Sequence, residues 1–325
     1  MLYNIKKSFA IHQIKQNNHT IYFEEYGNPK GIPVIFLHGG PGSGCNDNQK
    51  ALFDYKKFRV IFLDQRGSGK SVPKGSVKNN TTLLLINDIE LIRKYLKISS
   101  WIVVGGSWGA TLAVAYAEMY HTKVKAMILR SLFLGTKKEV DWAFFEAPLR
   151  FRSQLFYEVN NILNQKKLVN PIYILGPMLE NKNYKIKSLA ARLWLAYESN
   201  LSTIKFNYKN LQEIKLDLAK KKTMLPNTPF IEWHYIKNKF FLKVNQLLKN
   251  KRKLNKIPIA IVQSDYDLLC PPSTSFNFAA GLANCKIFRV ECAGHYISDP
   301  GVQEKMKQLL DEYEKKQENF NTFIN

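Results

Sequence analysis

The chain has 325 residues, of which 45% are hydrophobic and 23% are charged, and these values exclude a disordered protein, a collagen-like repeat and a disulfide-stapled mini-domain. The 48 basic residues outnumber the 26 acidic ones, so the formal net charge is +22. Such a charge raises the alternative of a nucleic-acid or anionic-membrane partner. The length allows two domains, or one core with a large insertion.

The kind of basic residue argues against a nucleic-acid partner. Only nine of the basic residues are Arg and 39 are Lys, and Lys lacks the planar fork that reads phosphates and base edges. The basic clusters at 220–222 and 249–253 contain no aromatic residue on which a base could stack. We therefore interpret the charge as a compositional bias and predict no nucleic-acid partner.

The cysteines and the N-terminus bear on the compartment. The four cysteines show no C-x-x-C and no zinc-ligand spacing, which favours a reducing compartment over a disulfide framework. Residues 1–15 lack the apolar stretch of a signal peptide. No apolar run approaches the ~18 residues of a membrane span. These features predict a cytoplasmic protein with no membrane partner and no metal site.

The predicted elements begin with two strands, at 8–15 and 20–26, that could form an antiparallel pair. Short apolar runs without alternation then follow, and such runs are typical of strands that are covered on both faces of a parallel sheet. They lie at 33–37, 59–63, 101–104, 126–129, 257–262 and 286–290. Helical patterns lie at 81–97, 107–120 and 302–317. The alternation predicts an α/β fold with a mostly parallel central sheet and helices on both faces.

The character of the chain changes between 137 and 250. Strand-like runs disappear there, and long amphipathic stretches with scattered prolines take their place. This pattern predicts a helical domain at 137–250, inserted into a core that is formed by residues 1–136 and 251–325.

A candidate nucleophile lies at the end of the predicted strand 101–104. Residues 105–109 read G-G-S-W-G, a G-x-S-x-G sequence that a small-residue helix follows. A strand and a helix on either side are the context of a nucleophile elbow, in which a tight turn holds the serine exposed at the helix N-terminus. We predict that Ser107 is a catalytic nucleophile.

Serine needs a general base and an orienting carboxylate. Of the six histidines, only His295 follows a late strand, which is where the order Ser, Asp/Glu, His places the base. The acid should follow the strand 257–262, and there both Asp265 and Asp267 fit. Spacing alone leaves the two aspartates open.

Acyl transfer also needs backbone N–H donors for the oxyanion. One should come from Trp108, the residue after the nucleophile. The other should come from the loop that follows strand 33–37 and reads H-G-G-P-G at 38–42, and Gly40 is the predicted donor.

Four motifs in this order resemble those of the proline iminopeptidase family of the α/β-hydrolase fold. They read H-G-G-P-G at 38–42, D-Q-R-G-S-G-K-S at 64–71, G-G-S-W-G at 105–109 and D-L-L-C-P at 267–271. The resemblance implies a helical cap on a hydrolase core, and release of N-terminal proline from peptides. It implies neither a metal nor an organic cofactor.

The resemblance also assigns residues. It implies a triad of Ser107, Asp267 and His295, and thereby prefers Asp267 to Asp265. It further implies that the substrate amine is held by Glu198, in W-L-A-Y-E at 194–198, and by Glu232, in I-E-W-H-Y at 231–235.

The chemistry of the substrate agrees with an acidic subsite. An α-amine with a pKa of ~7.7–8.0 is largely an ammonium ion at neutral pH, and carboxylates bind it by charge-assisted hydrogen bonds. Phe133 resembles an aromatic wall for the proline ring, although core packing is an equal alternative for it.

Some positions depart from the family pattern. They are S-D-Y-D at 264–267, R-S-L-F at 130–133, Tyr197 and Tyr296. Because several border the predicted substrate pocket, an esterase or amidase that acts on a different small acyl substrate is the alternative function.

Overall fold

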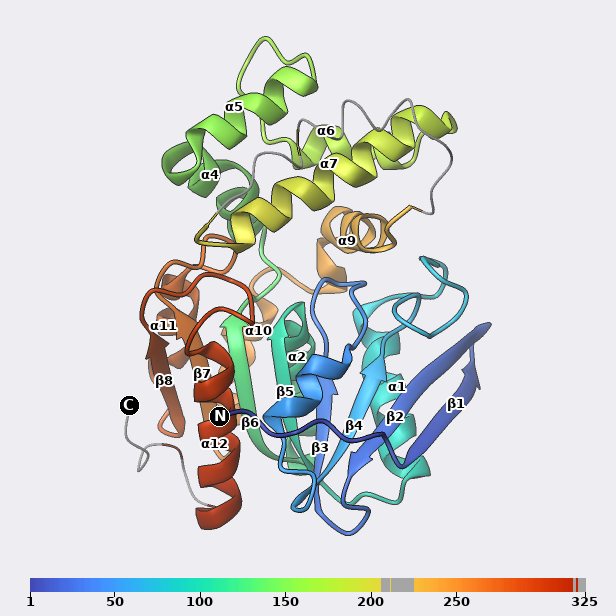
Figure 1. The fold of residues 1–325 in the computed structure, drawn as a ribbon, viewed down its shortest axis with the longest axis vertical. Coiled ribbons are helices and arrows are strands. Elements are labelled where there is room, and N and C mark those ends of the chain that lie inside the picture. The colour runs from blue at the N-terminus through green and yellow to red at the C-terminus, as the bar shows by residue number, and fades with distance from the viewer. Residues whose placement is uncertain (206–210, 212–224, 318–319, 321–325) are drawn as a thin grey trace.

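The computed structural model describes residues 1–205, 211, 225–317 and 320. Eight strands in this part of the chain form one sheet, in the order β1-β2-β4-β3-β5-β6-β7-β8 (Figure 1). Their bounds are β1 (Ala10–Gln16), β2 (His19–Gly27), β3 (Ile32–Leu37), β4 (Phe58–Asp64), β5 (Trp101–Ser107), β6 (Val124–Leu132), β7 (Ile259–Ser264) and β8 (Cys285–Val290).

This sheet confirms the predicted strands and their mostly parallel arrangement. β1 pairs antiparallel with β2, and β2 pairs antiparallel with β4. Every later neighbour pair, from β3–β4 to β7–β8, is parallel. β5 is buried along most of its length, as expected for a run of apolar residues without alternation in the middle of a sheet.

Helices cover both faces of the sheet, as predicted. α1 (Thr82–Tyr95), α2 (Trp108–Tyr120) and α11 (Pro272–Ala279) lie on one face, and α12 (Val302–Lys316) lies on the other with the short helix η1 (Asp47–Leu52) (Figure 1). The apolar sides of the two helix layers form two separate core clusters. The two helix layers therefore support the sheet from both faces, and the carboxyl ends of its parallel strands lie together at one end of the sheet.

The described residues between β6 and β7 form helices. They are α3 (Lys137–Asp141), η3 (Trp142–Glu146), α4 (Ala147–Phe151), α5 (Ser153–Ile162), α6 (Ile172–Leu179), α7 (Tyr184–Ser202), α9 (Thr228–Lys237), η4 (Lys239–Phe241), α10 (Gln246–Asn250) and η5 (Lys251–Leu254), and one further short helix, η2 (His121–Lys123), follows α2. Figure 1 shows α4 to α7 and α9 as a layer above the carboxyl ends of the strands.

The end of this helical segment lies on the core and not above it. Gln246 and Asn250 of α10 donate hydrogen bonds of 3.1 and 2.6 Å to the carboxylate of Glu118 on α2. Within the described residues the chain has therefore returned to the core before residue 251. The boundaries 1–136, 137–250 and 251–325 stay a prediction, and the Lys220–Lys222 cluster lies outside the described residues.

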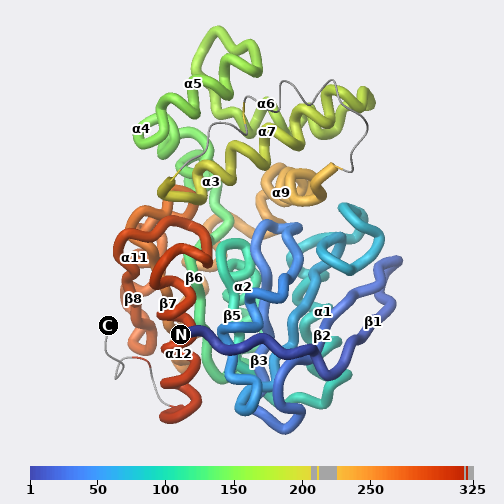
Figure 2. Tube along the Cα trace, viewed as in Figure 1, coloured from blue at the N-terminus to red at the C-terminus, as the bar shows by residue number. Residues whose placement is uncertain are grey.

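The N-terminal segment runs across the face that carries α12 (Figure 2). The Tyr3 hydroxyl donates a 2.9 Å hydrogen bond to Asp311 on α12, and the Tyr3 N–H donates to the carbonyl of Ala51 on η1. These contacts attach the first residues to the core, at a distance from the cap layer.

The cysteines and the longer helices bear on two expectations from the sequence, a lack of disulfides and a lack of membrane spans. The four cysteines, all of which lie in the described part, are free thiols. Among the same residues, no helix combines the length and the apolar character that crossing a lipid bilayer requires.

Candidate active site

Ser107 ends β5 and immediately precedes α2, on a strained turn. Its backbone has φ 55° and ψ −124°, a region that side-chain-bearing residues adopt rarely and mostly at functional sites. The turn depends on close packing, because a Cβ at Gly109 would lie 2.1 Å from the carbonyl oxygen of Leu37 on β3. Ser107 is therefore held half-buried at the carboxyl end of β5.

Ser107 lines a cavity that lies between the carboxyl ends of the strands and the cap helices. The cavity contains about 460 Å³ of empty space when its open mouth is included. Most of its wall is apolar, with Ser107 on the core side and two carboxyls on the cap side. Its lining residues are Gly40, Pro41, Ser107, Phe133, Val140, Ala143, Phe144, Glu198, Glu232, Ile236, Phe240, Leu269 and Cys270. Five of the residues predicted from the sequence thus meet in one cavity.

The structure brings Asp267 and His295 together. The His295 Nδ1 lies 2.9 and 3.0 Å from the two carboxylate oxygens of Asp267. The backbone N–H groups of Leu269 and Cys270 also donate to the Asp267 carboxylate, at 3.0 and 2.8 Å. Burial raises the pKa of Asp267, but the His295 charge and these hydrogen bonds outweigh burial, so the pKa lies below its ordinary value. The carboxylate stays ionised and holds the imidazole by its Nδ1.

Asp265, the other candidate acid, faces away from the imidazole. Its carboxylate accepts two hydrogen bonds from Arg289 on β8, at 3.0 and 2.8 Å. Of the two aspartates that spacing left open, Asp267 is therefore the one in contact with His295.

A buried arginine that we did not predict lies behind the histidine. Arg130, near the end of β6, donates to the backbone carbonyl of His295 and to the Ser131 hydroxyl. Burial lowers the pKa of this guanidinium. The R-S-L-F sequence at 130–133 was the available signal, because an arginine at the end of a buried strand needs buried partners.

Cys270 is a second residue that we did not predict. Its Sγ lies 4.0 Å from the Ser107 Oγ. Burial, followed by the charges of Asp267 and Glu139, raises the pKa of this thiol well above its ordinary value. The C-P of the 267–271 motif was its only signal.

Asp267, Cys270 and His295 each have one atom of a type that can bind a metal ion, and these three atoms lie within 4.8 Å of one another. The imidazole and the carboxylate already bind each other, and the thiol is protonated, whereas metal ligation needs a thiolate and free lone pairs. The arrangement fits an acid–base pair better than it fits metal ligands.

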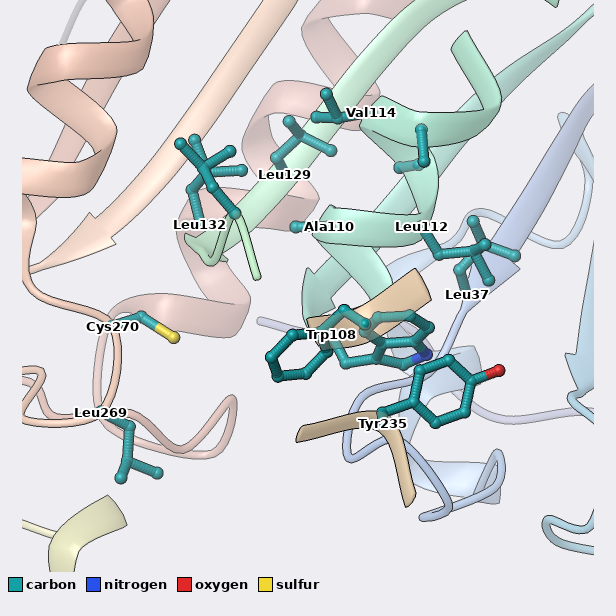
Figure 3. Packing of buried hydrophobic residues seen from close by; sticks show 14 of the residues in the cluster. Leu37, Trp108, Ala110, Leu112, Val114, Leu129, Leu132, Tyr235, Leu269 and Cys270 are labelled. Carbon is teal, nitrogen blue, oxygen red and sulfur yellow. The ribbon is translucent and has the colours of Figure 1, made fainter. Parts of the chain in front are cut away.

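Of the two predicted oxyanion donors, Gly40 lines the cavity together with Ser107, and Trp108 is the residue after Ser107. Gly40 has φ +106°, and a Cβ there would lie 2.6 Å from the Gly42 nitrogen, so only glycine fits this turn. Trp108 is fully buried, and its indole packs 4.6 Å from the ring of Tyr235 on α9 (Figure 3). Both donors therefore belong to backbone that close packing holds in place.

Glu198 on α7 and Glu232 on α9 form a carboxyl pair in the cap. The Trp194 indole N–H donates a 2.6 Å hydrogen bond to Glu232. Burial raises the pKa of Glu232 well above its ordinary value, and the charge of Glu198 raises it further. Burial also raises the pKa of Glu198, although less, because the His295 charge and a hydrogen bond with Glu232 oppose it. Glu232 is thus the member that keeps its proton longer as the pH rises.

The apolar wall includes Phe133, as the sequence suggested, and also Phe240. Phe133 is half-buried, and its ring meets that of Phe240 edge-on at 5.0 Å. Phe240 has φ 54°, and its carbonyl accepts a 2.5 Å hydrogen bond from Thr82 on α1. No sequence signal pointed to Phe240, because it lies over 100 residues from Phe133.

Comparison with known proteins identifies the family. The α/β-hydrolase fold family matches over residues 32–302. A proline iminopeptidase of Arabidopsis thaliana is 36% identical over 307 residues, which cover 90% of this chain and 78% of that protein. The proline iminopeptidase of Neisseria gonorrhoeae is 32% identical over 317 residues, which cover 96% and 98%.

Solved structures show that the fold is shared more widely. The proline iminopeptidase of Mycobacterium smegmatis has a TM-score of 0.62 at 17% identity, over 95% of this chain and 100% of that one. The esterase RhEst1 of a Rhodococcus species has a TM-score of 0.61 at 14% identity, over 94% and 98%. These two likenesses concern the fold, whereas the sequence matches identify the relatives, and the chain therefore belongs to the proline iminopeptidase family of α/β-hydrolases.

Proposed function

We propose that the protein is a serine aminopeptidase that releases N-terminal proline from peptides. One observation carries the proposal: the cavity has the Ser107 hydroxyl on its core side and the carboxyl pair of Glu198 and Glu232 on its cap side. A carboxyl pair inside an apolar cavity is costly without a cationic partner. The ammonium group of a peptide N-terminus is such a partner, and the names of the relatives agree with it.

The proposed reaction begins with attack of the Ser107 Oγ on the carbonyl carbon of the first residue. His295 holds its Nδ1 toward Asp267, which leaves Nε2 to take the serine proton and then to give it to the leaving amine. The Gly40 and Trp108 N–H groups stabilise the oxyanion of the tetrahedral intermediate. Water, with His295 again as base, then releases proline from the acyl-enzyme.

The cap provides the specificity in this proposal. An ammonium group bound by Glu198 and Glu232 fixes the N-terminus in the cavity, so that the peptide bond after the first residue reaches Ser107. Phe133 and Phe240 supply an apolar wall against which a pyrrolidine ring can pack. The helices between β6 and α10 act as the cap domain, and we place the enzyme in the cytoplasm.

A panel of aminoacyl-arylamides and short-chain esters tests the function. Wild type should hydrolyse the prolyl-arylamide best, and Ser107→Ala should abolish turnover. Glu198→Gln should lower kcat/KM about 10- to 100-fold, as expected when a hydrogen bond to a charged group is lost.

Glu158→Gln is the matched control, because Glu158 lies on cap helix α5 and is not among the cavity-lining residues. Its kcat/KM should equal that of wild type. Turnover of esters with no turnover of any aminoacyl-arylamide would instead support the esterase alternative, and full activity of Ser107→Ala would refute the nucleophile.

A further inference from the structure

Gln65, the residue after β4, connects the two chain segments that carry the proposed oxyanion donors. Its side-chain oxygen accepts a 2.8 Å hydrogen bond from the Trp108 indole N–H. Its side-chain nitrogen donates a 2.8 Å hydrogen bond to the backbone carbonyl of His38. Gln65 is 2% exposed, His38 1% and Trp108 0%. Water therefore cannot replace these partners, and the bridge is part of the rigid core.

The imidazole of His38 continues the bridge toward Gly40. The backbone N–H of Gln65 donates to the His38 Nε2 at 3.0 Å, so this nitrogen carries no proton. The proton is then on Nδ1, which donates to the carbonyl oxygen of Gly39 at 2.8 Å. Burial lowers the pKa of His38 and so favours this neutral form. The Gly44 N–H also lies 3.3 Å from the His38 Nδ1, but a protonated Nδ1 has no lone pair with which to accept a hydrogen bond.

The hydrogen bond to Gly39 matters because of the peptide group that it contacts. The carbonyl of Gly39 and the N–H of Gly40 belong to one peptide group, and that group is planar. A hydrogen bond to the oxygen on one side therefore fixes the direction of the N–H on the other side. The Gly39 carbonyl also accepts a longer hydrogen bond, of 3.4 Å, from the Ser43 N–H, so the His38 contact is the shorter of the two that hold this peptide group.

We propose that Gln65 and His38 are positioning residues for the oxyanion hole, which they hold as one unit with the Trp108 side chain. The inference rests on the proposed function, because it takes the Gly40 and Trp108 N–H groups as the oxyanion donors. Neither side chain lines the cavity, so both act through these peptide groups. Preorganised donors act on the charge that develops in the transition state, so loss of the bridge should lower kcat and leave KM almost unchanged.

Gln65→Met tests the bridge with little change of volume. We expect kcat for the prolyl-arylamide to fall about 10-fold or more, since loss of one oxyanion donor costs about 10²–10³, and KM to change by less than about 3-fold. The matched control is Tyr116→Phe, which removes the hydroxyl that accepts from another buried indole, that of Trp101, at 3.2 Å. Tyr116→Phe should lower the melting temperature and leave kcat as in wild type.

Two inhibitors separate positioning from a structural role. Pyrrolidine-2-boronic acid forms a tetrahedral adduct with the Ser107 Oγ, in which a boron-bound oxygen occupies the oxyanion hole, whereas pyrrolidine keeps the amine and the ring but has no oxygen at that place. In Gln65→Met the boronic acid should bind more weakly by about the factor that kcat loses, and pyrrolidine should bind as to wild type. Equal losses for both inhibitors, or an unchanged kcat, would overturn the proposal.

Trp108→Phe provides a second variant in case Gln65→Met does not fold. It removes the indole N–H together with part of the ring volume, and it keeps an aromatic ring next to Tyr235 and Phe240. It should lower kcat in the same direction, and combining it with Gln65→Met should cost less than the sum of the two changes. Additive losses would contradict a shared unit.

The outcome for Gln65 is separable from the outcome for the function. If wild type hydrolyses no prolyl-arylamide, the proposed function fails, and the same comparison is made with the ester that wild type turns over. If wild type hydrolyses the prolyl-arylamide and Gln65→Met keeps its kcat, only the present inference fails.

Discussion

The two cap carboxyls are the residues to which the proposed function assigns substrate choice. Glu232 is 3% exposed and accepts a hydrogen bond from Trp194. In the free protein its pKa is raised, so the folded state favours the neutral carboxyl. The charged carboxylate that the substrate complex needs therefore destabilises the folded protein when no substrate is bound, as is common where function and stability compete.

Glu232→Gln should for this reason stabilise the protein while it impairs turnover. The folded-state pKa lies above the unfolded one, so the contribution of the wild-type carboxyl to stability is present at low pH and is lost as the pH rises through the folded-state pKa. Gln does not titrate. At pH 8 the variant should have a higher melting temperature than wild type, by roughly 2–4 °C for each kcal/mol of unfolding free energy gained. At pH 4 the two melting temperatures should be almost equal. A gain of equal size at both pH values would contradict the raised pKa.

At the scale of elements, helix α7 joins the substrate subsite to the general base. The carbonyl of Ser202, at the end of α7, accepts hydrogen bonds from the backbone N–H groups of His295 and Tyr296, at 2.9 and 3.3 Å. The hydroxyls of Ser199 and Tyr296 lie 3.0 Å apart. Because Glu198 is on the same helix turn, the amine subsite and the His295 loop should shift together.

Tyr296→Phe tests this connection at one of the positions that depart from the family pattern. A neutral hydrogen bond contributes about 0.5–1.5 kcal/mol, so kcat/KM should fall about 2- to 10-fold. Ser199→Ala should have a similar effect, and the double variant should lose little more. Tyr266→Phe, on the neighbouring loop, is the control. If the two single losses add in the double variant, α7 and the loop act independently.

The contact between α2 and β3 is the element packing on which the nucleophile turn depends. Gly109→Ala would force a Cβ to 2.1 Å from the Leu37 carbonyl, where backbone and not a flexible side chain is in the way. Overpacking of this kind costs about 1–3 kcal/mol or more, so the melting temperature should fall by roughly 5 °C.

Gly281→Ala is the comparison for Gly109→Ala, because a Cβ at Gly281 meets nothing within 4 Å and only its φ of +77° opposes alanine. It should cost less, and Ser107 should react with a fluorophosphonate as in wild type. Equal melting temperatures for the two variants would show that the α2–β3 contact can relax.

At the scale of the molecule, a chain with a net charge of +22 has a cavity whose charged side chains are two glutamates. Several lysines in the described residues have structural partners. Lys251 donates to the carbonyls of Asn277, Phe278 and Ala280 at the end of α11, where cations are favourable. One lysine of the 249–253 cluster thus caps a helix.

Turnover should depend little on salt as a consequence. The ammonium–carboxylate contact forms inside the cavity, where ions screen it far less than at the surface. Raising NaCl from 50 to 500 mM should change kcat/KM for the prolyl-arylamide by less than about 3-fold. A nucleic-acid-binding protein would instead lose affinity steeply over the same range, and titration with a labelled RNA measures this. Salt-sensitive RNA binding with salt-sensitive turnover would contradict our interpretation of the charge.

Local patterns were sufficient to predict the strands and to single out Ser107 as the candidate nucleophile. Runs such as 101–104 have no alternation because both faces are buried, and a glycine-flanked serine between a strand and a helix has few other uses. His295 could be found from the order of elements alone. The family motifs then pointed to Glu198 and Glu232, which no periodicity would separate from surface glutamates.

The sequence by itself determined the class of sheet and indicated Ser107 and His295 as the candidate nucleophile and base, because burial, periodicity and turn chemistry are local properties of neighbouring residues. The tertiary structure decided which aspartate meets His295: Arg289 on β8 binds Asp265, and Asp267 is left for the imidazole. It also decided that Gln65 joins the loop at His38 to the helix that begins at Trp108. Those contacts follow from a strand order in which β3 lies between β4 and β5, and no local pattern records which strands become neighbours.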